Sequence, residues 1–259
     1  MLIMKKIVLL AVLIIVSVFA FAQKPVIFGV YLGTSVPMGN LGEGDKINHT
    51  NLDPIKYVFI MDKYNQCYAG VGFNLGFDVT VKLPVNGLGV FGGFDFFYNT
   101  NNSEIKKYMD EVKQSWENES DVSEYSYNLP NFMNLPILFG VNYQHSFNHI
   151  VGVFGEVGIG PNIRFITNHE GKIKYTSEYE SYTNKFDTAA TFGFKIGTGV
   201  MLWDCLSVAL DYYSLGNAKI NGTITEKVGI DKYVIPEMKF ESRNEISASE
   251  LVLRVGYHF

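Results

Sequence analysis

The sequence predicts an all-β fold, an eight-stranded antiparallel up-and-down transmembrane β-barrel. Three observations lead to this prediction. Long segments alternate strictly between apolar and small or polar residues, short and long connections follow one another in turn, and the chain ends in an alternating strand whose last residue is Phe259. Successive side chains of a strand point to opposite faces, so each such segment has one apolar face and one small or polar face.

The clearest alternation covers residues 67–81. One face carries Phe73 and Leu75, and the other carries Asn74 and Gly76, a pattern that no helical period produces. The same alternation predicts seven further strands, at about 26–36, 88–98, 132–145, 150–166, 188–203, 206–215 and 251–259. Several exceed the ~5–6 residues usual in soluble proteins and reach the ~9–11 residues that cross a bilayer at a tilt.

The connections between these strands alternate in length. Residues 83–87, 146–149 and 204–205 are short turns, whereas about 37–66, 99–131, 167–187 and 217–248 are long loops. Bacterial transmembrane barrels combine an even strand number with short periplasmic turns and longer extracellular loops. A soluble ligand-binding barrel would turn its apolar face inward, but here the small and charged face must line the interior, so the apolar belt requires lipid.

The N-terminal residues 1–22 predict a signal peptide, leaving 23–259 as the barrel. Lys5 and Lys6 precede an apolar run, and Ala20-Phe21-Ala22 forms a small-x-small cleavage site before Gln23. The run is shorter than the ~20 residues of a membrane-spanning helix. Without Lys5 and Lys6 the mature chain has 19 Lys and Arg against 26 Asp and Glu, a net charge of −7 that argues against nucleic acid as a partner.

Charged residues on the inward faces form the candidate site, which we call the lumen charge network. Most of them are expected near mid-height: Asp78, Asp95, Glu156, Arg164, Lys195, Asp211 and Arg254. Adjacent strands allow two cross-strand ion pairs, Glu156–Lys195 and Asp211–Arg254. The network could form an ion-selective constriction or simply fill the lumen. We favour a filled lumen, because an eight-stranded barrel is only wide enough for its own side chains.

The loops offer a helix but no catalytic motif. Ile105, Tyr108, Met109, Val112 and Trp116 recur at helical spacing and predict an amphipathic helix that covers the barrel mouth or binds a partner. His49 and His169 fall in predicted loops, where we expect them to be solvated. No nucleophile motif accompanies them, so we predict no enzyme activity, no metal and no cofactor.

The two cysteines are predicted to remain unlinked. Cys67 begins a strand at the extracellular end, and Cys205 lies in a periplasmic turn. About fourteen strand residues separate these levels by roughly 35 Å, whereas a disulfide requires Cα atoms within ~7 Å.

Several short motifs carry a resemblance to a known family. They are Gly29-Val30-Tyr31-Leu32-Gly33-Thr34 followed by Pro37, Asn134-Leu135-Pro136-Ile137-Leu138, Phe154-Gly155-Glu156-Val157-Gly158-Ile159-Gly160-Pro161, and Phe259. With them the chain resembles the small Gram-negative outer-membrane β-barrel family, also described as outer membrane protein beta-barrel domain or porin-like. The resemblance implies a place in the cell outer membrane, contact with its lipids, and recognition of Tyr257 and Phe259 by the barrel-assembly machinery.

The sequence leaves three functions open. The first is a non-enzymatic barrel with a largely filled lumen and a structural or surface-interaction role, in which four long extracellular loops meet a surface ligand or protein partner. The second is a passive porin-like pore for small solutes, and the third is an enzyme at the rim.

Overall fold

The computed structural model describes residues 26–42, 67–176, 178–230, 233–234 and 238–259. The predicted signal peptide, His49 and most of the first long loop lie outside these ranges. No helix within them is long and apolar enough to cross a membrane.

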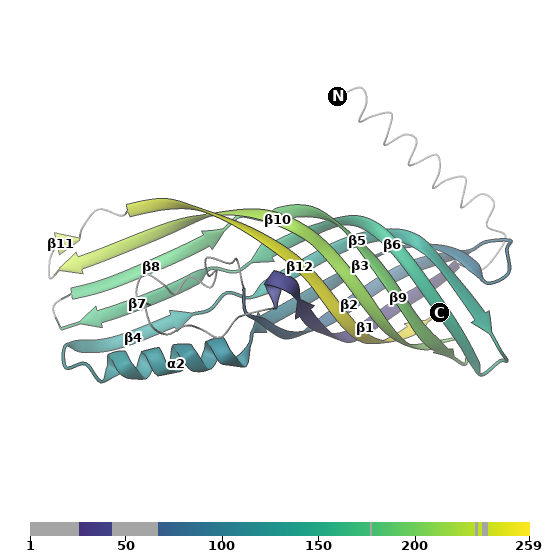
Figure 1. Ribbon diagram of the computed structural model, residues 1–259, viewed down its shortest axis with the longest axis horizontal. Helices are drawn as coiled ribbons and strands as arrows, with labels where there is room; N and C mark the ends of the chain where they lie inside the picture. Colours follow the sequence, from purple (N-terminus) through teal and green to yellow (C-terminus); the bar gives the residue numbers. More distant parts are fainter. Residues whose placement is uncertain (1–25, 43–66, 177, 231–232, 235–237) are drawn as a thin grey trace, which may run out of the picture.

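Eight antiparallel strands form a closed ring (Figure 1). In ring order they are β1 (Val26–Met38), β2 (Ala69–Lys82), β3 (Leu88–Asn101), β5 (Phe132–Ser146), β6 (Val151–Ile166), β9 (Ala189–Leu202), β10 (Leu206–Ile230) and β12 (Met238–His258). The ring closes where β12 pairs with β1, with Tyr257 opposite Val30 and Ser249 opposite Met38. The predicted eight-stranded up-and-down barrel is confirmed.

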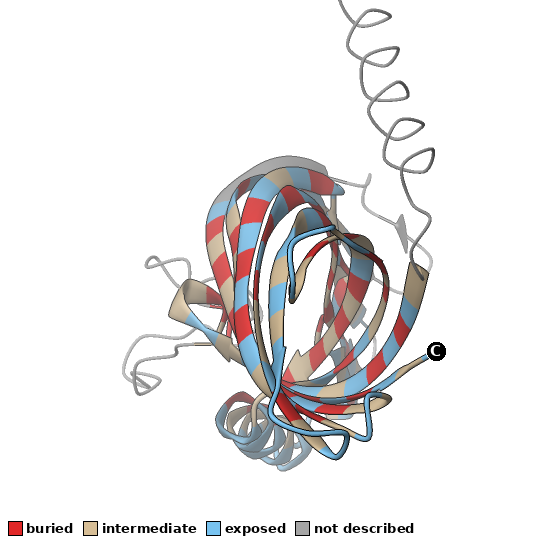
Figure 2. Ribbon diagram, turned by 90° about the vertical axis from the view of Figure 1, so that its right-hand side faces the viewer, coloured by how far each residue is buried: buried red, intermediate tan, exposed pale blue. Residues whose placement is uncertain are grey.

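Burial alternates along each strand, as the banding in Figure 2 shows. Leu253 points outward and is 59% exposed, whereas the next residue, Arg254, points inward and is 2% exposed. The exposed outward residues include Leu32, Leu75, Phe139 and Phe192. This apolar outer surface is the belt that contacts lipid.

The strand ends differ from the prediction, because most of the residues expected in long loops form regular structure. β10 continues past the expected end at 215 to Ile230, and β12 begins at Met238 instead of 251. The second and third loops contain α2 (Ser103–Glu117), β4 (Val122–Asn128), β7 (His169–Tyr175) and β8 (Glu178–Phe186). Strand pairing does not stop at the membrane surface. In β10 the register with β12 shifts between Ser214 and Asn217, which interrupts the alternation at the predicted end of the strand.

These elements build a sheet beyond the barrel, which we call the extension (Figure 1). Its strand order is β12-β10-β8-β7-β4, and the two-residue β11 (Tyr233–Val234) pairs with the end of β10. Since bacterial barrels keep their short turns in the periplasm, the extension lies on the extracellular side.

Helix α2 confirms the predicted amphipathic helix. It begins after Asn102, whose side chain accepts a hydrogen bond from the Ile105 backbone N–H at 3.0 Å. This cap satisfies one N–H of the first turn. Ile105 and Met109 are buried in the same apolar core as Phe132 and Ile166 of the barrel, so the helix packs onto its extracellular end.

The lipid-facing belt gives a direct test of the side-chain orientations. Leu75→Arg should destabilise the barrel by about 2–4 kcal/mol, because it places a charge in hydrocarbon. Val85→Arg is the matched control, since Val85 is exposed in the β2–β3 turn. Reversible unfolding from lipid vesicles measures both, and an equal cost at the two positions would contradict the assignment.

The cysteines give a test of the topology. Cys67 and Cys205 form no disulfide, and Cys67 is buried while Cys205 is partly exposed. A thiol reagent should therefore modify Cys205 faster in the folded protein. After unfolding without reductant, mass spectrometry should find both cysteines modified, and a Cys67–Cys205 bridge would exclude this strand order.

Candidate functional site

Six of the seven predicted network residues meet in one level of the lumen. With two tyrosines they form the central charge layer, and each is at most 7% exposed. Its members are Tyr31, Asp78, Asp95, Glu156, Lys195, Asp211, Tyr213 and Arg254. Their strands surround the lumen, so the layer spans it.

Both predicted ion pairs are present. Lys195 Nζ lies 2.6 Å from Glu156 Oε1, and Arg254 Nε lies 2.5 Å from Asp211 Oδ2. Arg254 also binds Glu156 through its terminal nitrogen, joining β12 to β6 across the lumen. Glu156 therefore receives two cations and is the centre of the layer.

Tyrosines bind the two carboxylates that have no ion pair among the described contacts. Tyr31 donates a hydrogen bond to Asp78, and Tyr213 donates one to Asp95 Oδ2 at 2.9 Å. The Arg254 guanidinium lies 4.0 Å from the centre of the Tyr31 ring, a cation–π contact. Neither bond was predicted. Tyr213–Asp95 joins β10 to β3, which are not neighbours in the ring, whereas Tyr31–Asp78 joins the adjacent strands β1 and β2 but was not considered because only residues of opposite charge were paired.

Arg164 lies apart from the central charge layer, so its expected place in one network was wrong. Its Nε donates to Asn134 Oδ1 at 2.9 Å and its Nη1 donates to the Ile246 carbonyl at 2.7 Å. Glu250, also fully buried, was missed because the last strand was predicted to begin at 251. Its alternation with Val252 and Arg254 was the signal that could have found it.

An apolar core fills the space on the extracellular side. Its fully buried members include Leu41, Phe97, Met109, Leu215, Ile246 and Val252. These residues come from η1 (Gly39–Leu41), β3, α2, β10 and β12. The core is therefore continuous from the barrel interior to α2.

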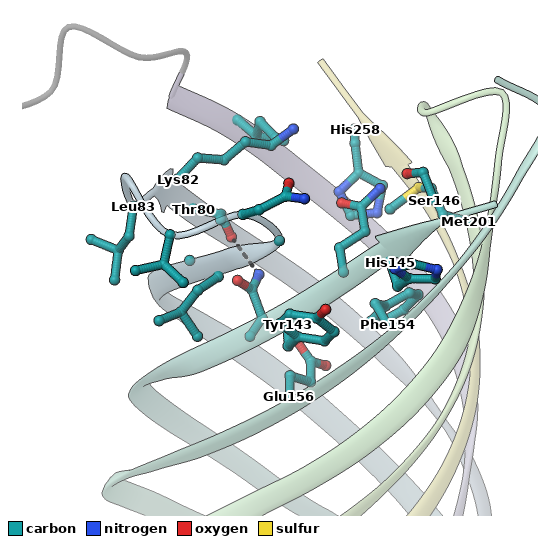
Figure 3. A pocket seen from close by; sticks show the side chains of 18 of the residues that line it. Thr80, Lys82, Leu83, Tyr143, His145, Ser146, Phe154, Glu156, Met201 and His258 are labelled. Carbon is teal, nitrogen blue, oxygen red and sulfur yellow. Dashed lines mark hydrogen bonds between the residues drawn. The ribbon is translucent and has the colours of Figure 1, made fainter. Parts of the chain in front are cut away.

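A cavity of about 600 Å³ opens at the opposite, periplasmic end (Figure 3). Tyr31, Asp78 and Glu156 of the central charge layer line it, together with Thr80 and Phe154. Lys82, Gln144, His145, Asp204 and His258 also line it. We call this cavity the periplasmic cup.

His169 does not follow the prediction of a solvated loop histidine. It lies on β7 of the extension, is 1% exposed, and its Nε2 is 3.1 Å from the Tyr182 hydroxyl oxygen. Burial lowers the pKa of His169 to about 3. The imidazole is therefore neutral at physiological pH and part of the extension's core.

The described residues contain no group of three or more His, Cys, Asp or Glu side chains arranged to hold a metal ion.

The two terminal aromatics both face outward at the periplasmic edge. Phe259 stacks on Phe28 with ring centres 5.8 Å apart, and on Tyr257 at 6.2 Å. The backbone of Phe259 exchanges two 2.9 Å hydrogen bonds with Phe28. The last residue thus takes part in closing the barrel.

The sequence model of the outer membrane protein beta-barrel domain family matches residues 8–259. The chain belongs to this family. It is accordingly an outer-membrane protein, and its lipid-facing belt meets the lipids of that membrane. No curated protein matches its sequence.

Solved structures of outer-membrane proteins are similar to this chain. Ail, the attachment invasion locus protein of Yersinia pestis, is 11% identical, with 90% of this chain and 97% of that chain covered and a TM-score of 0.36. A major outer membrane protein from Thermus thermophilus is 14% identical, covering 91% and 100%, with a TM-score of 0.41. OprG from Pseudomonas aeruginosa is 11% identical, covering 90% and 94%, with a TM-score of 0.37.

The central charge layer predicts strong coupling around Glu156. Glu156→Gln should destabilise the barrel by about 3–5 kcal/mol, because it leaves Lys195 and Arg254 buried with less neutralising charge. Adding Lys195→Met should recover part of the loss, so the two changes should be far from additive. Urea unfolding in lipid vesicles measures the free energy of unfolding of the single and double variants, with Lys219→Gln at an exposed position as the control. Additive costs of the two substitutions would contradict the pairing of Glu156 with Lys195.

The buried His169 predicts a pH-dependent extension. The pKa of His169 is about 6.5 in the unfolded state and about 3 in the folded state. The contribution of the neutral imidazole to the folding stability of the extension is therefore complete above pH 6.5. It declines below that pH by about 1.4 kcal/mol per unit, as the unfolded state takes up the proton. Hydrogen exchange protection of β7 and β8 should fall about tenfold between pH 6 and 5. His169→Phe should remove this pH dependence. If the protection of β7 and β8 falls equally in the variant, a group other than His169 causes the pH dependence.

Proposed function

We propose that this protein is a non-enzymatic, closed outer-membrane barrel that presents its extension to a ligand or protein partner at the cell surface. The observation that carries the proposal is the filled lumen: the central charge layer and the apolar core above it occupy the barrel interior. A barrel with a filled lumen anchors the protein in the membrane, and the surface that remains available to bind a partner is the extension outside the membrane.

The extension has a buried face and a polar face. On the first, Tyr125 pairs with Ile173, and both are buried. On the second, Lys172 pairs with Ser126 and Ser181, and Lys185 pairs with Thr223. A firmly paired sheet holds such side chains in fixed positions, which lowers the entropy cost of binding a partner.

The periplasmic cup favours a second candidate function, a narrow pore for small solutes. The cup already forms an entrance from the periplasm. Displacement of the central charge layer would be needed to extend it through the barrel.

We also propose that Tyr257 and Phe259 are the residues that the barrel-assembly machinery recognises during assembly.

Single-channel conductance of the refolded protein in planar bilayers separates the two functions. We expect no steady conductance of porin size, because the ion-paired layer spans the lumen. A porin-like conductance in the wild-type protein would exclude the closed barrel.

Binding to immobilised glycans and proteins tests the surface role. Lys172→Glu combined with Lys185→Glu should reduce the retained signal, since both lysines project from the polar face of the extension. Lys82→Glu, at the periplasmic end, is the matched control. A signal insensitive to the extension variants would contradict this role.

A further inference from the structure

The polar face of the extension carries a row of hydroxyl groups between lysines. Along β8 the side chains on this face include Tyr179, Ser181 and Thr183. Lys172 of β7 pairs with Ser181 on one side, and Lys227 of β10 pairs with it on the other. Neighbouring strands lie ~4.8 Å apart, so the two lysines stand about 10 Å from each other across the row. The hydroxyl groups therefore lie between positive charges on two sides.

This face is basic, although the full chain has a formal net charge of −5. Four lysines and two glutamates project from β4, β7, β8 and the part of β10 that pairs with β8, which gives a formal charge of +2. They are Glu124, Glu170, Lys172, Lys174, Lys185 and Lys227. The other carboxylates of these segments alternate onto the opposite face, where Glu180 pairs with Ile173 and Glu226 with Tyr182.

Three of the four lysines keep their charge free. Lys172 Nζ lies 3.7 Å from Glu124 Oε2. Lys174, Lys185 and Lys227 are exposed, and none of them has an ion pair among the residues that the structure describes. An anionic ligand therefore meets three ammonium groups without separating an existing pair. Because each exposed charge contact is weak, these spaced lysines favour a polymer with repeated negative charges over a single small anion.

Tyr179 adds an aromatic platform to the row. It pairs with Gly229 of β10, and a Cβ at Gly229 would lie 2.1 Å from Tyr179 Cε1 and 2.7 Å from Cζ. The ring therefore lies across the neighbouring strand, in space that glycine leaves free. Lys174 pairs with Tyr179 from the other side. The negative face of an aromatic ring attracts polarised C–H groups, which a sugar ring presents on its faces.

We propose that an acidic polysaccharide binds along β8 on the polar face, with a sugar ring on Tyr179 and its anionic substituents at the lysines on either side. The inference names the ligand class for the proposed surface role and rests on that role. A polyanion without sugar rings matches the lysines but not the platform. A neutral glycan matches the platform but not the lysines.

Calorimetric titration of the protein in phosphatidylcholine nanodiscs tests the charge contacts. Dextran sulfate should bind, neutral dextran should give no measurable heat, and poly-glutamate should bind more weakly than dextran sulfate. Lys174→Gln combined with Lys227→Gln should weaken dextran sulfate about tenfold, since two charge contacts are lost. The matched control is Lys107→Gln combined with Lys113→Gln on α2, where each lysine is paired with a glutamate. It removes the same charge and should leave the affinity unchanged.

Substitutions of Tyr179 separate a glycan from other polyanions. Tyr179→Ala should weaken dextran sulfate about fivefold and leave poly-glutamate unchanged, because only the sugar uses the ring. Tyr179→Phe keeps the ring and should retain the binding of dextran sulfate. Hydrogen exchange of β8 verifies that each variant is folded.

Equal affinity for poly-glutamate and dextran sulfate, an equal loss of both in Tyr179→Ala, or an equal effect of the α2 control would each overturn the proposal. The proposed surface role fails separately. If dextran sulfate does not bind while Lys172→Glu combined with Lys185→Glu still lowers binding to an immobilised protein, the ligand class is wrong and the surface role stands.

Discussion

The pairing of β12 with β1 is the constraint on which the remaining structure depends. Within a bilayer no water is present to bond an exposed strand edge, so each backbone N–H and C=O must find its partner in the protein. Here the first and last strands meet over ten residue pairs from Gly29–His258 to Met38–Ser249. The two hydrogen bonds between Phe28 and Phe259 complete the ring at its periplasmic edge.

A closed ring of eight strands fixes the width of the lumen, and that width explains its contents. Glycine makes room for the larger inward groups: a Cβ at Gly197 would lie 1.8 Å from Asp211 Oδ1, and a Cβ at Gly158 would lie 2.9 Å from the Phe91 ring. The central charge layer therefore fits only because its neighbours have no side chain. Once Glu156, Lys195 and Arg254 are enclosed, mutual pairing is the arrangement that avoids an isolated buried charge.

The same strands serve different purposes on the two sides of the membrane. On the extracellular side β10 and β12 remain paired as far as Glu226 and Met238, and β8, β7 and β4 add to their edge. The apolar core continues from the lumen into this region through Ile220 and Ile246, so the extension is anchored by side-chain packing as well as by backbone bonds. On the periplasmic side the turns are short, and the lumen remains open as the cup.

The sequence by itself determined the barrel, because alternation is a local property of a strand. Spacing within one or two segments gives the orientations of Leu75 and Asn74 and the number of barrel strands. It also gives the two ion pairs between adjacent strands and the helix containing Ile105 and Met109.

The tertiary structure alone decided the rest. Tyr213–Asp95 and Arg254–Glu156 depend on which strands face each other across the lumen, and ring curvature and strand stagger set those distances. Arg164 shares the inward face with Lys195, yet it lies at another level. Likewise, the burial of His169 depends on the pairing of β7 with β8 above the membrane, in residues 167–187 that local alternation had left as a loop.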